Sequence, residues 1–272
     1  MSPAEPGVGS VRDALAAAVD SLTAAGCETP RLDAELLLAD AMEVDRAALI
    51  ASPERQVPPA AARRAMDAVR RRVRREPVAY ILGRKGFRRI ELAVDARVLV
   101  PRPETELLVE IGLALPQGAS VHDVGTGSGA VALAIKDERP DLRVSASDAA
   151  EGAIEVARAN AERLGLDVEL VVSHWLPDGD YDLVVANLPY VREQEWRALA
   201  PEIREHEPRD ALVSGHDGLD AIRELVDAAP GGTLVALEHS PEQGEAVRGR
   251  LEEGVTRRDL AGLERVTVGR TT

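Results

Sequence analysis

Cysteine is almost missing from this chain of 272 residues, which contains Cys27 and no other. A single thiol permits no disulfide within the chain and cannot supply a set of thiolate ligands to a metal. The five histidines also lack the close spacing that metal ligands show in sequence. We therefore expect neither a disulfide framework nor a metal centre.

Aromatic residues are nearly as scarce, at 2% of the chain, and only two lysines occur, Lys85 and Lys136. Hydrophobic residues still make up 45% of the sequence, so we expect a folded core built from Val, Leu, Ile and Ala. Long apolar runs are absent, and the N-terminus is rich in Pro, Gly and Glu. The sequence thus predicts no signal peptide, no membrane-spanning segment and a cytoplasmic location.

Positive charge is in deficit, because the formal net charge is −14. Proteins that hold bare nucleic acid normally present a basic face that releases counterions from phosphates. The acidity argues against stable nucleic-acid binding without excluding a local basic patch, and it suits a basic protein partner. The one dense basic cluster is Arg70, Arg71, Arg72, Arg74 and Arg75. We interpret it as a solvated helix end, in preference to a contact patch for RNA or an acidic partner.

The N-terminal third follows a helical pattern after a loose tail at residues 1–10. Apolar residues recur at helical spacing from Val11 to a stop at Gly26, over Pro30–Met42 and over Pro58–Arg75. This pattern predicts a small helical domain spanning residues 1–75. Residues 76–100 change to Val78–Leu82, a glycine-flanked turn and an alternating apolar segment, which together predict a β-hairpin linker.

Residues 101–272 are predicted to form the third and largest region. Thr105 is expected to cap a helix over Glu106–Leu115. The predicted strands cover 120–124, 142–147, 168–172, 181–186 and 233–238, with two more near 254–259 and 264–269. Further helices are expected near 129–138, 151–164, 217–229 and 242–253. This alternation is typical of an α/β protein whose parallel sheet has helices on both faces and binds ligands beyond the carboxyl ends of its strands.

A glycine-rich loop follows the first of these strands, in the order Asp123, Val124, Gly125, Thr126, Gly127, Ser128, Gly129. Glycines allow the backbone to turn sharply and lie against a ligand at a helix N-terminus. Asp148 ends the next strand, where its carboxylate can accept both hydroxyls of a ribose. Both features suit S-adenosylmethionine and NAD equally, because the loop also satisfies the dinucleotide fingerprint.

The fourth strand is followed by Asn187-Leu188-Pro189-Tyr190, and this motif distinguishes S-adenosylmethionine from NAD as the expected ligand. The Asn187 side chain and the Leu188 carbonyl can accept two N–H bonds from a planar nitrogen, whose lone pair then faces a methyl donor, while Tyr190 packs on the flat group. Nicotinamide chemistry requires no such group, and an ordinary proline turn is the less favoured interpretation. These four residues are the predicted catalytic motif.

Three further residues lie near the same edge of the predicted sheet. Trp175 can cover an adenine or pack in the core. Glu238 and His239, which end the fifth strand, can serve as acid and base, although for His239 a structural hydrogen bond is at least as well supported.

The chain resembles the release factor glutamine methyltransferases, the PrmC/HemK family, in stretches that run from one end of the sequence to the other. Besides the motifs above, they are Arg31–Leu38, Arg75–Gly83, Val100–Glu106, Glu207–Arg209, Gly215–Gly218, Gln243-Gly244, and Asp259–Gly262 with Arg265-Val266. The resemblance implies a Rossmann-like seven-stranded class I methyltransferase sheet joined to a partner-binding helical domain. It implies S-adenosylmethionine, bound by Asp123, the Gly125–Gly129 loop, Asp148, Trp175 and Asn187, and left as S-adenosylhomocysteine.

The resemblance also implies transfer to the glutamine amide in the Gly-Gly-Gln loop of class I peptide chain release factors. Separately from the resemblance, we expect the enzyme to be a monomer. The sequence departs from the family at Leu188, where Pro is usual, at His174, where Asp is frequent, and at Ser240, where Gly is usual. Leu188 still supplies a backbone carbonyl and precedes Pro189, which keeps it out of the helical region. The alternatives are a ribosomal-protein glutamine or nucleic-acid adenine-N6 methyltransferase, a dinucleotide-dependent oxidoreductase and a catalytically silent binding module.

Overall fold

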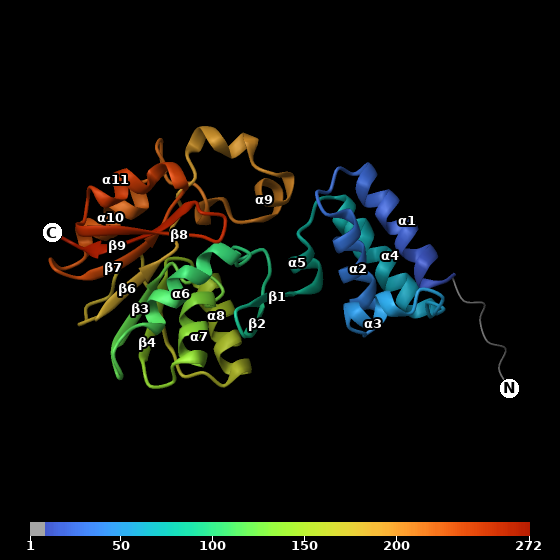
Figure 1. The fold of residues 1–272 in the computed structure, drawn as a ribbon, viewed down its shortest axis with the longest axis horizontal. Helices are drawn as coiled ribbons and strands as arrows, with labels where there is room; N and C mark the ends of the chain where they lie inside the picture. The colour runs from blue at the N-terminus through green and yellow to red at the C-terminus, as the bar shows by residue number, and fades with distance from the viewer. Residues whose placement is uncertain (1–8) are drawn as a thin grey trace. The chain divides into compact units, whose positions relative to one another are not determined.

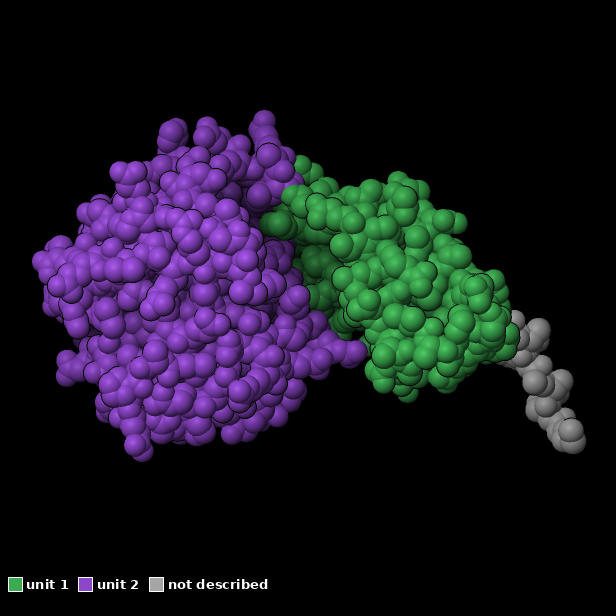
Figure 2. Space-filling view, viewed as in Figure 1, with its two compact units in different colours: residues 1–83, 200–206 green, residues 84–199, 207–272 purple. Residues whose placement is uncertain are grey.

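The computed structural model describes residues 9–272, which form two compact units (Figure 2). The first unit runs to Gly83 and also includes Ala200–His206, and the second combines Arg84–Leu199 with Glu207–Thr272. Of the loose tail expected at residues 1–10, all but Gly9 and Ser10 lie outside the described residues. Across residues 9–272, no helix has both the length and the apolar character needed to cross a membrane.

The first unit is helical, as the sequence predicts. Its helices are α1 (Val11–Ala24), α2 (Pro30–Ala41), α3 (Arg46–Ala51), α4 (Pro59–Val73), α5 (Val78–Leu82) and α9 (Pro201–His206). Helix α1 begins at a capping box, in which the Ser10 hydroxyl accepts from the Asp13 N–H at 3.2 Å and the Asp13 carboxylate accepts from the Ser10 N–H at 3.1 Å. Leu15 and Leu22 then face a buried cluster shared with α2 and α4.

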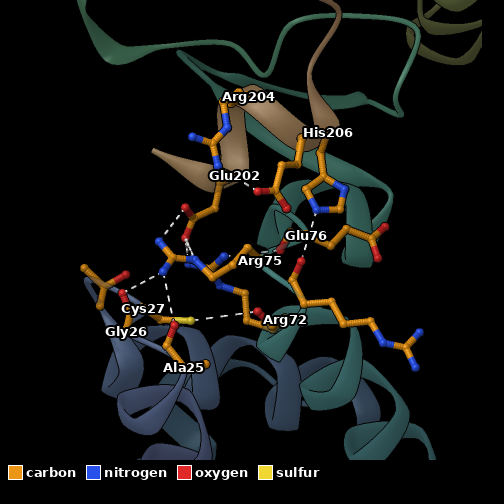
Figure 3. A network of polar contacts seen from close by, with 12 residues as sticks. Ala25, Gly26, Cys27, Arg72, Arg75, Glu76, Glu202, Arg204 and His206 are labelled. Carbon is orange, nitrogen blue, oxygen red and sulfur yellow. Dashed lines mark hydrogen bonds and ion pairs between the residues drawn. The ribbon is translucent and has the colours of Figure 1, made fainter. Parts of the chain in front are cut away.

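A network of ion pairs ties α9 to α4 within this unit (Figure 3). The Arg72 side chain is only 7% exposed and pairs with Asp33 of α2 at 2.7 Å and with Glu202 of α9 at 2.8 Å. Arg75 pairs with the same Glu202 at 2.6 Å and donates to the Gly26 carbonyl at 2.9 Å. Buried charges need such partners because an unpaired charge is costly to remove from water.

The interpretation of the arginine cluster as a solvated helix end is therefore wrong for Arg72 and Arg75. Arg71 pairs with Glu76 at 2.5 Å, and only Arg70, paired with Asp67, retains a largely exposed side chain among these four. The sequence pattern misses this outcome because the carboxylate of α9 lies more than a hundred residues downstream.

The expected β-hairpin is present in the second unit, but it is shorter than predicted. Strands β1 (Arg84–Phe87) and β2 (Ile90–Ala93) pair in antiparallel register. Val78–Leu82, which we expected to be extended, instead forms α5 and ends at Gly83 in the left-handed region, with φ +69°. A five-residue apolar run has no diagnostic period, and Pro77 favours the start of a helix as readily as a strand.

A seven-stranded sheet forms the centre of the second unit (Figure 1). Its strands are β3 (Ser120–Val124), β4 (Arg143–Asp148), β5 (Glu169–Val172), β6 (Leu183–Ala186), β7 (Leu234–Glu238), β8 (Glu252–Arg258) and β9 (Glu264–Arg270). They lie in the order β5-β4-β3-β6-β7-β9-β8. The first five are parallel, as the alternation of strands and helices predicts, whereas β9 runs antiparallel to β7 and β8.

Helices and short 3-10 turns connect these strands. The helices are α6 (Glu106–Leu113), α7 (Ala130–Glu138), α8 (Glu151–Leu164), α10 (Asp220–Ala228) and α11 (Gly244–Arg248), and the 3-10 turns are η1 (Pro103–Thr105), η2 (Glu193–Ala198), η3 (Arg209–Ala211) and η4 (Pro241–Gln243). The helix expected near 242–253 is thus confined to α11, because β8 already begins at Glu252. One buried cluster joins α10 to β6 and β7 through residues such as Leu225, Val184 and Leu237.

Candidate active site

The predicted motifs meet at one edge of the sheet. Strand β3 lies between β4 and β6, so the order of the strands reverses between β3 and β6. The glycine loop follows β3, Asp148 ends β4, Asn187 follows β6 and Glu238 ends β7. Parallel strands place their carboxyl ends at the same edge, and a ligand crevice opens where the order reverses.

The glycine loop adopts a backbone that other residues adopt with strain. Gly125, Gly127 and Gly129 have φ values of +72°, +56° and +84°. A Cβ added at Gly129 would lie 2.8 Å from Leu133 Cδ1, so α7 packs directly on the loop. The Gly125 N–H also donates to the Ser147 carbonyl of β4 at 2.9 Å. The loop is therefore held against β4 with its surface open to a ligand.

Two carboxylates flank this loop in different environments. Asp123 is 2% exposed, and burial raises its pKa to about 7, although the Thr126 hydroxyl donates to it at 2.6 Å. The Asp148 carboxylate accepts one N–H from Gly127 and one from Ala150, each at 2.9 Å. Each oxygen of a carboxylate has a further lone pair, so Asp148 keeps the capacity to accept two hydroxyls.

A cavity of about 270 Å³ lies against these groups. Seven of the predicted site residues line it: Asp123, Gly125, Thr126, Gly127, Ser128, Asp148 and Asn187. The chain around Pro101 and Pro208 also lines this cavity. Glu207 holds these two segments together, because it accepts the Val100 N–H at 3.1 Å and the Arg102 guanidinium at 2.5 Å.

Trp175 does not line this cavity. It packs beside the hydrophobic cluster of β6, β7 and α10, with the His174 ring against its edge at a centroid distance of 4.2 Å. Trp175 is partly buried beside this cluster, and adenine cover by its ring stays a prediction.

The Asn187–Tyr190 motif is fixed by contacts on both sides. The Asn187 Nδ2 group donates to Thr105 Oγ1 at 3.0 Å, and Leu188, 7% exposed, packs in the same hydrophobic cluster. Tyr190 is half-buried, and its hydroxyl donates to Glu238 Oε1 at 3.3 Å. Burial and the neighbouring Glu238 raise the pKa of Tyr190, so its hydroxyl stays protonated and available as a donor.

Glu238 and His239 differ in what they offer chemically. Glu238 is 1% exposed, and burial raises its pKa to about 7 against the opposing effect of the Thr105 and Tyr190 hydroxyls. His239 Nδ1 donates to the Ser240 carbonyl at 2.8 Å, so Nε2 accepts from the Thr267 hydroxyl at 2.8 Å. Both ring nitrogens are occupied, which favours the structural interpretation of His239.

Two supporting residues were not predicted as part of the site. Thr105 makes no capping hydrogen bond to α6, contrary to expectation, and contacts Asn187 instead. Gln243 donates to the Tyr190 carbonyl at 2.9 Å, and a Cβ at Gly218 would lie 2.1 Å from that same oxygen. In the sequence, Thr105 and Gln243 stand out only because they lie in stretches that resemble the family. The spacing of residues along the chain does not show which group either side chain contacts.

Comparisons with known proteins agree with this geometry. The family model described as PrmC N-terminal domain matches residues 13–83, and the model described as Methyltransferase small domain matches residues 103–214. Release factor glutamine methyltransferases from Neisseria gonorrhoeae and Pseudomonas aeruginosa are 42% and 46% identical, over 89% and 88% of this chain and 93% and 92% of their own. The enzyme of that name from Geobacter sulfurreducens is 38% identical over 98% of both chains.

The chain belongs to the release factor glutamine methyltransferase family. It is accordingly an S-adenosylmethionine-dependent methyltransferase, and the predicted fold class is confirmed. The catalytic domain of hMettl16, solved with an RNA hairpin, shares the fold with a TM-score of 0.53 over 76% of this chain and 82% of that chain, at 13% identity. The relatives of this chain are named for release factors, so the comparisons do not favour the alternatives of a ribosomal-protein or a nucleic-acid substrate.

Proposed function

We propose that this enzyme methylates the side-chain amide nitrogen of the glutamine in the Gly-Gly-Gln motif of class I peptide chain release factors. The observation that carries the proposal is the position of Asn187, which lines the cavity beside the glycine loop. Its side-chain Nδ2 group donates to Thr105, and no group among residues 9–272 donates to its Oδ1. The names of the relatives supply the substrate, and the site supplies the chemistry that such a substrate needs.

The donor side of the proposed site is the cavity formed by the glycine loop and Asp148. Asp148 is proposed to accept the ribose hydroxyls, and Gly125 to Gly129 to line the path of the amino-acid portion. Asp123 and Thr126 are proposed to support the loop, within which the Thr126 hydroxyl donates to Asp123. Trp175 would have to turn from its partly buried position beside the hydrophobic cluster to cover the adenine. S-adenosylmethionine supplies an activated methyl group when bound there.

The acceptor side is the Asn187–Tyr190 motif. The amide lone pair of glutamine is delocalised, so the nitrogen is a weak nucleophile and needs orientation more than a strong base. Asn187 Oδ1 and the Leu188 carbonyl accept its two N–H bonds and direct the lone pair toward the donor. Pro189 restrains the turn, and Tyr190 packs on the flat amide while Glu238 holds the phenol.

The helical residues 1–75 are proposed to dock the remainder of the release factor, with residues 76–100 as a linker and 101–272 as the catalytic domain. A lone glutamine side chain offers too little contact area to offset the entropy lost on association. We therefore expect a short Gly-Gly-Gln peptide to be a far poorer substrate than the whole factor. We also propose that the enzyme acts in the cytoplasm, where translation terminates.

The test is to incubate the purified enzyme with labelled S-adenosylmethionine and a purified release factor, and to map the label. Label on the glutamine of the Gly-Gly-Gln motif, absent when that glutamine is replaced by alanine, supports the proposal. Label on RNA, on DNA or on a ribosomal-protein glutamine would refute the substrate assignment and leave the methyltransferase assignment intact.

A further inference from the structure

The side chain of Asn187 has one hydrogen bond to the described residues, and that bond uses its nitrogen. Nδ2 donates to Thr105 Oγ1 at 3.0 Å, across 82 residues of sequence. Among residues 9–272, no side chain or backbone group donates to Asn187 Oδ1. The acceptor atom of the amide is therefore the one left for a ligand in the cavity that Asn187 lines.

The contacts of Thr105 favour this orientation over its reverse. Thr105 is 4% exposed, so water has little access to its hydroxyl. A hydroxyl has one proton, and the Thr105 hydroxyl lies near enough to the buried carboxyl group of Glu238 to act against the rise of its pKa that burial causes. The carboxylate Oε2, which has no hydrogen-bond partner among the described residues, is an acceptor toward which that proton can turn. With that proton directed to Glu238, Oγ1 offers lone pairs to Asn187, which an N–H can meet and a carbonyl oxygen cannot.

The orientation matters because an asparagine amide has two nearly isosteric positions related by a half-turn. In one, Oδ1 accepts an N–H of the acceptor amide. In the other, Nδ2 opposes that N–H, donor against donor, and the acceptor nitrogen loses the bond that orients its lone pair. Burial of an unmatched polar group adds a further penalty.

We propose that Thr105 is a positioning residue, which fixes the amide of Asn187 so that Oδ1 rather than Nδ2 meets the nitrogen to be methylated. Glu238 acts one step further back, because its carboxyl group accepts the hydrogen bond of the Tyr190 phenol and attracts the hydroxyl hydrogen of Thr105. The inference rests on the proposed function for its acceptor, whereas the hydrogen bond itself belongs to the free protein.

The test compares Thr105→Val, which keeps the shape and removes the hydroxyl, with Thr105→Ser, which keeps the hydroxyl. Thr271→Val is the matched control, because Thr271 is 1% exposed and its hydroxyl donates to the Pro230 carbonyl away from the site. Turnover by Thr105→Val should fall by about tenfold, less than the roughly hundredfold cost of losing a group that itself contacts the reacting atoms, because Asn187 is still present. The KM for the release factor should change little, and Thr105→Ser and Thr271→Val should stay near wild type.

An independent readout is the side-chain N–H resonance pair of Asn187 in the free enzyme, identified by its absence from Asn187→Ala. We expect one proton of that pair to be protected from exchange in wild type and in Thr105→Ser, and to lose protection in Thr105→Val. Equal protection in all three proteins, or equal turnover in Thr105→Val and wild type, would overturn the inference. Failure of wild type to methylate any release factor would refute the proposed function and leave the resonance result unaffected.

Discussion

Gly125 and Leu188 approach so closely that a Cβ added to the glycine would lie 3.0 Å from Leu188 Cδ2. The contact joins the loop that follows β3 to the motif that follows β6. The proposed donor and acceptor sides of the site are thus packed against each other. A substitution on one side should therefore also shift residues on the other side.

Gly125→Ala should weaken S-adenosylmethionine binding by tenfold or more. Its φ of +72° is unfavourable for alanine by about 1–2 kcal/mol, and the new methyl would press on Leu188. Gly118→Ala is the control, because it has a similar φ of +76° with nothing within 4 Å of the added Cβ. Calorimetric titration should show weakened binding for the first variant alone; equal affinities would remove Gly125 from the donor side.

Leu188→Pro should retain turnover, because the proposed contact uses a backbone carbonyl that proline also supplies. The variant loses a buried side chain from the cluster of β6, β7 and α10, so we expect unfolding free energy to fall by about 1–3 kcal/mol. Rate assays beside urea denaturation separate the two effects. Abolished turnover in a folded variant would contradict the carbonyl role.

Asp148→Ala should weaken S-adenosylmethionine binding by about 1.5–3 kcal/mol, the worth of a charge-assisted hydrogen bond to the ribose. Part of the loss would come from the glycine loop, since Asp148 also holds the Gly127 N–H. Asp182→Ala is a suitable control, because that carboxylate accepts from Ser120 at the other end of β3. Unchanged affinity in Asp148→Ala would remove the residue from the site.

His122 should make the fold sensitive to acid. Its ring is 1% exposed between the Ser145 and Ser147 hydroxyls, and burial lowers its pKa from 6.5 to about 4. The stability it contributes is therefore present above pH 6.5 and is lost as the pH falls toward 4, by about 3 kcal/mol in all.

Asp123 and Glu238 act in the opposite direction, because burial raises the pKa of each to about 7 and their contribution is lost as the pH rises through that value. The measurement that isolates His122 is the difference in urea-unfolding free energy between wild type and His122→Gln. The unfolding free energy of His122→Gln should rise relative to that of wild type as the pH falls from 7 to 4.5, because only wild type loses the contribution of His122. A difference that does not vary with pH would show that His122 is not held neutral.

The strands and the ligand-binding edge could be predicted from the sequence because their signals are local. The glycine loop after Val124, the carboxylate of Asp148 and the amide of Asn187 each mark the end of a predicted strand, and parallel strands gather those ends at one edge. The same reasoning failed at Val78–Leu82, where five apolar residues fit a strand or a helix equally well and packing decided for α5.

Pairings across long sequence distances could not be predicted. The partner of Arg72 and Arg75 is Glu202, and the partner of Asn187 is Thr105, which local pattern suggested as a helix cap. A hydroxyl before a helix is ordinarily a cap, and only the fold reveals that this one faces the end of β6 instead. The parts of the site that set its chemistry are therefore less visible in the sequence than the parts that set its backbone.

The central claim is that orientation of the acceptor amide by Asn187 drives the transfer, and Asn187→Ala tests it most directly. The measurement is the single-turnover rate of methyl transfer to a release factor at saturating S-adenosylmethionine, with the fold checked by thermal unfolding. The account predicts a folded protein whose rate is lower by about a hundredfold or more. A folded Asn187→Ala enzyme that transfers at nearly the wild-type rate would contradict it.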